Sequence, residues 1–191
     1  MAVCTGLFAG AESENLLKGG GFESTNGMWN EAAGNSNGND GYTDKLIGIG
    51  QHNLIAEGWS ATNDRGTRMT VDHTTDAKDG NYALKFNIPS ATDTVPITLY
   101  PKIESVDTGA LTAGGAYYKL TAWVKGTNGK SYIEIKTTDG KTYTQAITVG
   151  QTWHKVSLDN IYLSKSVAFA GLNDNKGYHI AVVVNKDTAE E

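Results

Sequence analysis

Four aromatic side chains fall on the polar side of predicted strands, where the alternation of the sequence does not assign them to the core. They are Tyr100, Tyr117, Trp123 and Tyr132. Aromatic rings stack on the apolar C–H faces of sugars, while neighbouring polar groups fix the orientation of the sugar. Exposed aromatic patches also mark contacts between proteins. The sequence therefore predicts a contact face and leaves open whether a glycan or a protein binds to it.

Polar side chains on these predicted strands, and on the strand that follows them over residues 141–149, are suited to hold a ligand by hydrogen bonds. Lys119, Glu134 and Gln145 are the candidates, because they offer an ammonium, a carboxylate and an amide group. A further aromatic residue, Trp29, lies in a long segment over residues 25–43 that is rich in Asn and Gly. Loops of this length are more often functional or packed than idle, so we expect Trp29 either to anchor the loop or to contact the ligand.

The elements that must position these side chains are short β-strands. Residues 116–125, with the sequence AYYKLTAWVK, alternate core-type side chains with Tyr, Lys, Thr and Trp, which is typical of a half-buried strand. Turn signals such as Asn128-Gly129 recur along the chain. We predict an all-β fold, a jelly-roll β-sandwich of about ten short antiparallel strands. Residues 1–14 are expected to form an N-terminal arm that lies on a surface, and residues 15–191 a single sandwich domain.

The composition argues against several classes of protein. The 191 residues include 21 Asp and Glu against 16 Lys and Arg, and the formal net charge is −5. Phosphate contacts need clustered Lys and Arg, so we expect no nucleic acid partner. No apolar run approaches the roughly 20 residues of a membrane-spanning helix, so we expect no membrane partner. The single cysteine, Cys4, allows no internal disulfide.

The sequence predicts no catalytic residues and no enzyme activity. The histidines His52, His73, His154 and His179 show no spacing typical of metal ligands or of a catalytic triad. The motifs of serine hydrolases, phosphate-binding loops and zinc proteases are also missing from the chain. We therefore expect a binding or structural role.

Five segments, in this order, resemble the jelly-roll carbohydrate-binding modules of the wider galactose-binding-like group. They are NLLKGGGFES, EGWSAT, DAKDGNYALKF, AYYKLTAWVKG and GQTWHKVSLDNIYL. Each motif is short, but their shared order and spacing between residues 15 and 163 indicate the fold. The resemblance implies that Trp59 and Trp153 pack in or near the core. The strand with an Asp that usually closes such modules is not evident in the last segment, YHIAVVVNKDTAEE.

The resemblance also implies a structural calcium ion near the first predicted strand. The glutamate of its Phe-Glu motif corresponds to Glu23, and Asp79 is a second candidate oxygen donor. Calcium takes six to eight oxygen ligands, so two carboxylates alone do not make a site. The alternative is that Asp79 caps a turn and that Glu23 is solvated or hydrogen-bonded. No other cofactor is expected.

Two functions fit these observations. The first is a structural or decoration protein of a larger assembly, such as a capsid-auxiliary or surface protein of a phage virion, with glycan adhesion as a second activity. The second is a carbohydrate-binding module of a secreted, extracellular glycoside hydrolase. Residues 1–14 lack the features of a signal peptide, which favours the virion surface. Other subunits would then be the partners, through the N-terminal arm and an open sheet edge.

Overall fold

The computed structural model describes residues 2–9, 15–23, 45–47, 51–56, 58–63, 69–87, 97–126, 131–147, 150–172 and 177–184. Within these residues the strands form two six-stranded sheets, and their pairings are antiparallel. This confirms the predicted all-β class. The jelly-roll order of the strands stays a prediction.

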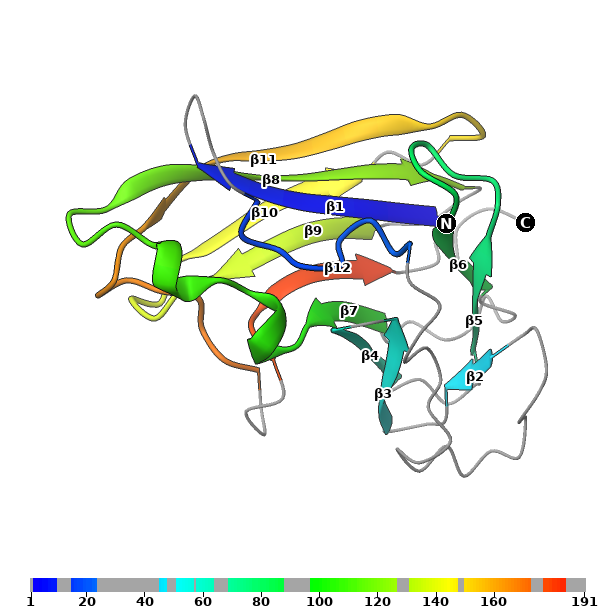
Figure 1. Ribbon diagram of the computed structural model, residues 1–191, viewed down its shortest axis with the longest axis horizontal. Coiled ribbons are helices and arrows are strands. Elements are labelled where there is room, and N and C mark those ends of the chain that lie inside the picture. The colour runs from blue at the N-terminus through cyan, green and yellow to red at the C-terminus, as the bar shows by residue number, and fades with distance from the viewer. Residues whose placement is uncertain are drawn as a thin grey trace.

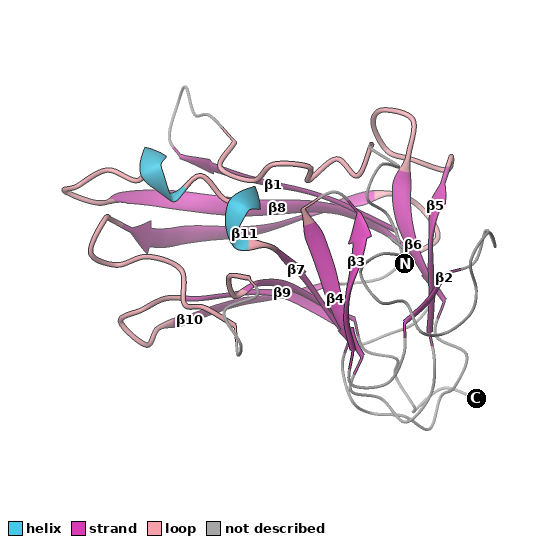
Figure 2. Ribbon diagram, turned by 60° about the horizontal axis from the view of Figure 1, so that its bottom comes forward, coloured by secondary structure: helices cyan, strands magenta, loops and turns pink. Residues whose placement is uncertain are grey.

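Each sheet combines strands that are far apart in the sequence. Sheet 1 contains, in order across the sheet, β11 (His154–Leu163), β8 (Ala116–Lys125), β1 (Ala2–Ala9), β6 (Ala83–Asn87), β5 (Met69–Thr74) and β2 (Lys45–Ile47). Sheet 2 contains β10 (Thr142–Ile147), β9 (Ser131–Lys136), β12 (Ile180–Val184), β7 (Ile97–Pro101), β4 (Trp59–Asn63) and β3 (Gln51–Ala56). The short 3-10 helices η2 (Ile103–Ser105) and η3 (Thr108–Ala110) lie between β7 and β8 in the chain. Figure 1 shows β11, β8 and β1 as one layer over β10, β9 and β12, and Figure 2 shows the layers from a turned view.

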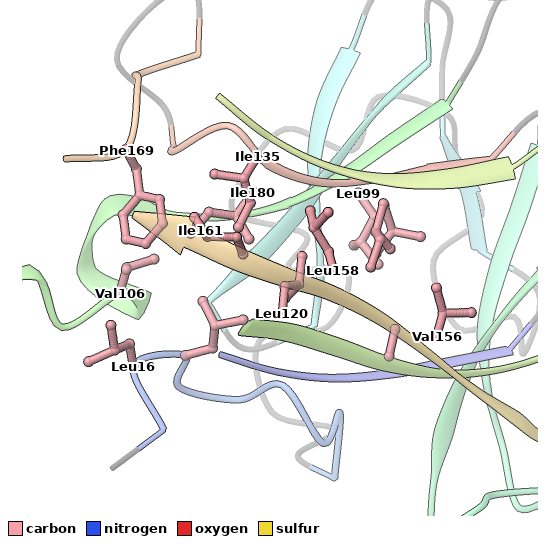
Figure 3. Packing of buried hydrophobic residues seen from close by; sticks show 14 of the residues in the cluster. Leu16, Leu99, Val106, Leu120, Ile135, Val156, Leu158, Ile161, Phe169 and Ile180 are labelled. Carbon is pink, nitrogen blue, oxygen red and sulfur yellow. The ribbon is translucent and has the colours of Figure 1, made fainter. Parts of the chain in front are cut away.

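The core lies between the two sheets and is built from every second residue of the long strands. On β8 the buried series includes Tyr118, Leu120 and Val124, as the alternation predicts. Figure 3 shows side chains of β8 and β11 between the layers, opposite Ile135 of β9 and Ile180 of β12. Each fully buried aliphatic side chain contributes about 1.5–3 kcal/mol of transfer free energy. The alternating strands therefore hold the two sheets together.

The structure corrects the prediction of an N-terminal arm. Residues Ala2–Ala9 form β1, which lies between β8 and β6 in sheet 1 (Figure 1). The register with β8 runs from Ala2 opposite Lys125 to Ala9 opposite Tyr118, and a shorter register joins β1 to β6. The sheet satisfies the backbone hydrogen bonds of this segment better than an isolated arm would. The rest of the predicted arm lies outside the described residues.

The segment predicted as the first strand, residues 15–24, is irregular over its described part. It forms isolated bridges rather than a strand, such as the bridge between Leu17 and Val106. Phe22 has a positive φ of 58° and is buried. Its ring meets the ring of Trp59 edge-on, with 5.3 Å between the centroids. The predicted packing of Trp59 in the core is confirmed, since this side chain is 1% exposed.

Candidate functional site

A β-bulge in the edge strand β11 changes the outer side of sheet 1. The register of β11 against β8 shifts between Leu158 and Ile161, so that Asp159 and Asn160 together oppose the single residue Lys119. Asn160 has a φ of 58°, in the left-handed region that Asn tolerates better than most residues. Bulges redirect side chains and are frequent beside functional sites. This bulge adds two exposed polar side chains to the sheet.

An aromatic pair lies next to the bulge. Tyr117 of β8 is 66% exposed and is paired in register with Tyr162 of β11. Their rings meet edge-on, with 5.6 Å between the centroids. Tyr162 Oη donates a hydrogen bond to the carbonyl of Gly114 at 3.2 Å. Gly115 has a φ of 82°, and a Cβ there would lie 2.1 Å from Tyr162 Oη, so this glycine makes room for the tyrosine pair.

These neighbours define one exposed surface at the edge of sheet 1. The bulge surface consists of Tyr117, Lys119, Asp159, Asn160 and Tyr162. Asp159 Oδ1 accepts a hydrogen bond from Ser157 Oγ at 2.9 Å, which fixes the direction of the carboxylate. The surface offers a ring face, a carboxylate acceptor, an amide that both donates and accepts, and an ammonium donor. It can stack on an apolar ring face and bind hydroxyl groups beside it.

Trp123, a predicted ligand residue, lies on the same side of β8 as Tyr117. At about 3.3 Å per residue of strand, the two residues are about 20 Å apart. Its side chain is half-buried. Lys78 Nζ lies 4.7 Å from the centroid of its ring, within the range of a cation–π contact. Trp123 is therefore partly covered, whereas Tyr117 is open to solvent.

The turn that carries Lys78 is tied to sheet 1 by Asp76. Lys125 Nζ donates to Asp76 Oδ2 at 2.5 Å, and Trp153 Nε1 donates to Asp76 Oδ1 at 3.3 Å. These two hydrogen bonds, first that of Lys125, hold the pKa of Asp76 below its usual value. Trp153 is half-buried in this contact with the exposed Asp76, and it is not among the described residues that pack in the core. This end of β8 has the features of a structural anchor.

The other predicted contact residues lie on sheet 2, so the structure divides the predicted face. Tyr132 and Glu134 belong to β9, and Tyr100 belongs to β7. The two sheets pack with their inner faces together (Figure 2), and their outer faces point in opposite directions. No single ligand of ordinary size can therefore contact both Tyr117 and Tyr132 from these faces.

The structure corrects the prediction that Tyr100 is exposed. Its side chain is 0% exposed although it alternates with the core residue Leu99. A Cβ at Gly177 would lie 2.6 Å from Tyr100 Cδ2, so the backbone of Gly177 packs directly against the tyrosine ring. Tyr100 is therefore covered from outside the sheet and cannot stack on a ligand in this conformation.

Glu134 is engaged in a polar cluster on the outer side of sheet 2. Its Oε1 lies 2.6 Å from His179 Nε2 and 3.5 Å from Lys136 Nζ, and Thr144 Oγ1 donates to its Oε2 at 3.5 Å. Burial is the main cause that lowers the pKa of His179, against the opposing effect of Glu134. Burial, and then Glu134, raises the pKa of the half-buried Tyr132. The carboxylate is thus already satisfied by protein groups.

Gln145 does not share the face of Glu134. It pairs in register with Ile133, whereas Thr144 pairs with Glu134. Directly opposite residues of antiparallel strands lie on the same side of the sheet, so Gln145 belongs to the core side, at the edge strand β10. Its side chain is exposed there, and its Nε2 donates to the carbonyl of Ala146 at 3.3 Å. Trp29 lies outside the described residues.

The carboxylate proposed as a calcium ligand is occupied by backbone donors. Glu23 Oε2 accepts from the amide of Asn81 at 2.7 Å, and its Oε1 accepts from the amide of Tyr82 at 3.2 Å. Asp79 Oδ1 accepts from the amide of Gly80 at 3.0 Å, as in a capped turn. Within the described ranges, no group of three or more His, Cys, Asp or Glu side chains is arranged to hold a metal ion. The two oxygens of Glu23 are thus engaged by backbone N–H groups, and the calcium ion stays a prediction.

Three residues of the bulge surface were not predicted from the sequence. Asp159, Asn160 and Tyr162 belong to the segment VSLDNIYL. A signal for them exists in the spacing of the buried residues, because Val156 and Leu158 are followed by Ile161 rather than by an apolar residue two positions on. Such a change of parity across two polar residues indicates a bulge.

In the described part of the chain, no helix has the length and apolar character required to cross a membrane. No family model, curated protein or solved structure matches this chain.

Proposed function

We propose that this chain is a non-catalytic structural component of a larger assembly that adheres to a glycan through the bulge surface. One observation carries the glycan part: an exposed tyrosine ring lies beside three exposed polar side chains. Tyr117 is 66% exposed, and the neighbouring Lys119, Asp159 and Asn160 are exposed as well. A sugar ring on Tyr117 would meet groups that bind hydroxyls on the side of β11.

The lower exposure of the other predicted aromatic residues favours this surface over the wider face predicted from the sequence. Trp123 is half-buried and has Lys78 over its ring. Tyr100 is buried under Gly177. Tyr132 is half-buried beside a satisfied carboxylate. Tyr117 is therefore the ring that a ligand can reach without rearrangement.

The assembly that we propose is the surface of a phage virion, where the chain would be a capsid-auxiliary or surface protein. The ends of the two sheets support contact with neighbouring subunits. In the described strands, β11 and β10 each have a strand partner on one side only, and unpaired edges offer backbone groups to other chains. The alternative, a carbohydrate-binding module of a secreted glycoside hydrolase, would use the same bulge surface and differ in what the chain is joined to.

A glycan array with matched variants tests the glycan part. We expect Tyr117→Ala to weaken binding about tenfold, because an aromatic contact contributes up to about 1.5 kcal/mol and about 1.4 kcal/mol is tenfold in affinity. Asn160→Gly removes the amide and keeps a residue that adopts positive φ easily, so it should weaken binding without unfolding the bulge. Circular dichroism verifies that each variant is folded.

Tyr132→Ala is the matched control, since it removes a tyrosine from the opposite sheet. It should leave glycan binding unchanged. Loss of binding in Trp123→Ala or Tyr132→Ala, with Tyr117→Ala unaffected, would contradict the bulge surface as the site. If no glycan on the array binds, and a photo-cross-linker at position 117 captures a neighbouring protein, the bulge surface binds a protein and not a glycan. Antibody labelling of intact particles tests the virion part separately.

A further inference from the structure

Two Asp-Gly pairs lie in turns of the described structure, and their geometry differs. Asp79-Gly80 lies in the exposed turn before β6, and Asp139-Gly140 lies in the turn between β9 and β10. In an Asp-Gly pair, the glycine amide nitrogen can attack the aspartate side-chain carbonyl carbon, because no side chain of the glycine hinders it. The reaction needs a carboxyl group that can turn toward an available amide nitrogen.

The carboxylate of Asp79 already faces that nitrogen. Its Oδ1 accepts a hydrogen bond from the amide of Gly80 at 3.0 Å. Both residues are exposed, and no other group in the described structure holds this carboxylate. Gly80 has a φ of 70°, a conformation that glycine adopts without strain. The nitrogen and the carboxyl carbon are therefore held close together by a single weak contact.

Both partners are restrained in the second pair. The amide of Gly140 donates to the carbonyl of Thr137 at 2.9 Å. Asp139 Oδ1 accepts from Thr137 Oγ1 at 2.5 Å and from the amide of Lys141 at 3.4 Å, and Lys141 Nζ lies 3.1 Å from Oδ2. The hydrogen bond of Thr137, and then that of Lys141, also lowers the pKa of Asp139, which disfavours the protonated carboxyl that loses water. This turn is protected.

We propose that Asp79-Gly80 is a site of spontaneous isoaspartate formation that releases the contact between Glu23 and the turn. The Gly80 nitrogen forms a bond to Asp79 Cγ, the nitrogen loses its proton, and one carboxyl oxygen leaves as water, which gives a cyclic succinimide. Water then opens the ring at either carbonyl. Opening at the main-chain carbonyl leaves the chain linked through the side chain. One water is lost and one is gained, so no other reactant is required.

The isoaspartate link adds a methylene group to the backbone directly before the residues that hold Glu23. The amides of Asn81 and Tyr82 donate to its two oxygens at 2.7 Å and 3.2 Å. The Glu23 carboxylate packs closely against the turn, because a Cβ on Gly80 would lie 2.2 Å from Glu23 Oε1. A longer backbone must therefore move the two amides away from the carboxylate. The segment that carries Glu23 also contributes the buried side chain of Phe22 to the core, so its loss of anchoring should lower the melting temperature.

Isotope labelling of the full chain tests the chemistry. The folded protein is aged at neutral pH in water enriched in the heavy oxygen isotope, since each cycle through the succinimide incorporates one labelled oxygen. Peptide mass spectrometry then measures label and isoaspartate at each position. We expect several-fold more of both at position 79 than at position 139. Equal or greater conversion at position 139 would overturn the proposal.

Two controls complete the test. The first asks whether the folded turn or the local sequence causes the preference for position 79. The second asks whether isoaspartate formation lowers the melting temperature. In strong urea the two pairs should convert at similar rates, and a preference for position 79 that persists there would refute the role of the turn geometry. The variant Asp79→Glu keeps the charge but cannot form the five-membered ring. Ageing should lower the melting temperature of the wild-type protein by more than that of Asp79→Glu, which retains the Asn-Gly pairs of the chain but not this Asp-Gly pair. Isoaspartate that accumulates without this shift would exclude the release of Glu23.

Discussion

The outer faces of the two sheets differ, although the same strand alternation underlies both. On sheet 1, Tyr117 alternates with the buried Tyr118 and is 66% exposed. On sheet 2, Tyr100 alternates with the buried Leu99 and is 0% exposed. On β12 of the same sheet, Val183 lies in register with Tyr132 and is also buried. Sheet 1 thus presents side chains to solvent near the bulge, whereas sheet 2 is covered across several strands.

This difference shows that parity in a strand determines the side of the sheet but not the exposure. Exposure depends on what lies outside the sheet. At Tyr100 it is the backbone of Gly177, a residue distant in sequence whose lack of a side chain permits the close approach. At Tyr117 the neighbouring strand contributes only the edge of another tyrosine ring.

Alanine substitutions of Tyr100 and Tyr117 should give the largest difference in stability between the two sheets. Tyr100→Ala should destabilise the fold by about 3–5 kcal/mol, as for other buried aromatic residues. Tyr117→Ala removes one edge-on aromatic contact and should cost less than about 1.5 kcal/mol. Urea denaturation of both variants measures the two free energies of unfolding. Similar small costs would show that sheet 2 is not covered at Tyr100.

The polar cluster on sheet 2 should contribute less, but its contribution should depend on pH. Glu134→Ala leaves the half-buried His179 without its carboxylate partner. Hydrogen bonds to charged groups contribute about 1.5–3 kcal/mol, and we expect a loss in this range at neutral pH. A loss comparable to that of an exposed ion pair, below about 1 kcal/mol, would show that the cluster is solvated.

The sign of the pH effect follows from the lowered pKa of His179. Burial lowers this pKa from its usual value of 6.5, so between the two values the unfolded chain binds more protons than the folded chain. The stability contribution is therefore complete above 6.5 and is lost as the pH falls through the lowered pKa. The pH dependence of the urea midpoint should decrease in His179→Gln. An unchanged dependence would assign the effect to other groups, and histidine resonances followed by NMR would identify them.

Two substitutions at the bulge sharpen the comparison further. Asn160→Val forces a β-branched residue into a φ of 58° and should cost about 1–2 kcal/mol. Asn160→Gly should change stability by less than about 1 kcal/mol, because glycine adopts this conformation freely. Thermal unfolding of both variants provides the measurement. Equal stability of the two would indicate that the bulge does not persist in solution.

The smallest effect is expected at the covered end of β8. Lys78→Ala removes the ammonium group from the ring of Trp123, a contact worth about 0.5–1 kcal/mol at exposed sites. Tryptophan fluorescence should become easier to quench by solutes as the ring is uncovered. Glycan binding should not change if the bulge surface is the site. Stronger binding would instead indicate that Trp123 is the stacking platform.

The sequence predicted the features that depend on local pattern. The alternation from Tyr118 to Val124 identified a half-buried strand and its inner face, and the structure has both. The burial of Trp59 followed from a motif rather than from spacing. The face of Gln145 was predicted wrongly, because the register of β10 against β9 places it opposite Ile133. One residue of shift in register exchanges the two faces of a strand.

The features that the sequence did not predict depend on contacts between distant segments. Residues 15–24 were predicted as the first strand, but the chain turns between Gly19 and Phe22 and seats Phe22 against Trp59. The segment 1–14 was read as an arm, because nothing near it in sequence reveals β8 as its partner. Long-range strand pairing is not encoded in local composition, so such assignments require the folded chain.

The central position of β1 has a consequence for the synthesis of the chain. β1 is synthesised before β8, and its pairing with β8 extends to Lys125, which is 123 residues (125 − 2) beyond Ala2. At about 5–20 residues per second, the segment waits at least several seconds for its partner. Pairing over such a separation is slow even for a complete chain, and an unpaired apolar segment can associate with other chains. β1 therefore completes its pairing in sheet 1 only after β8 has been made.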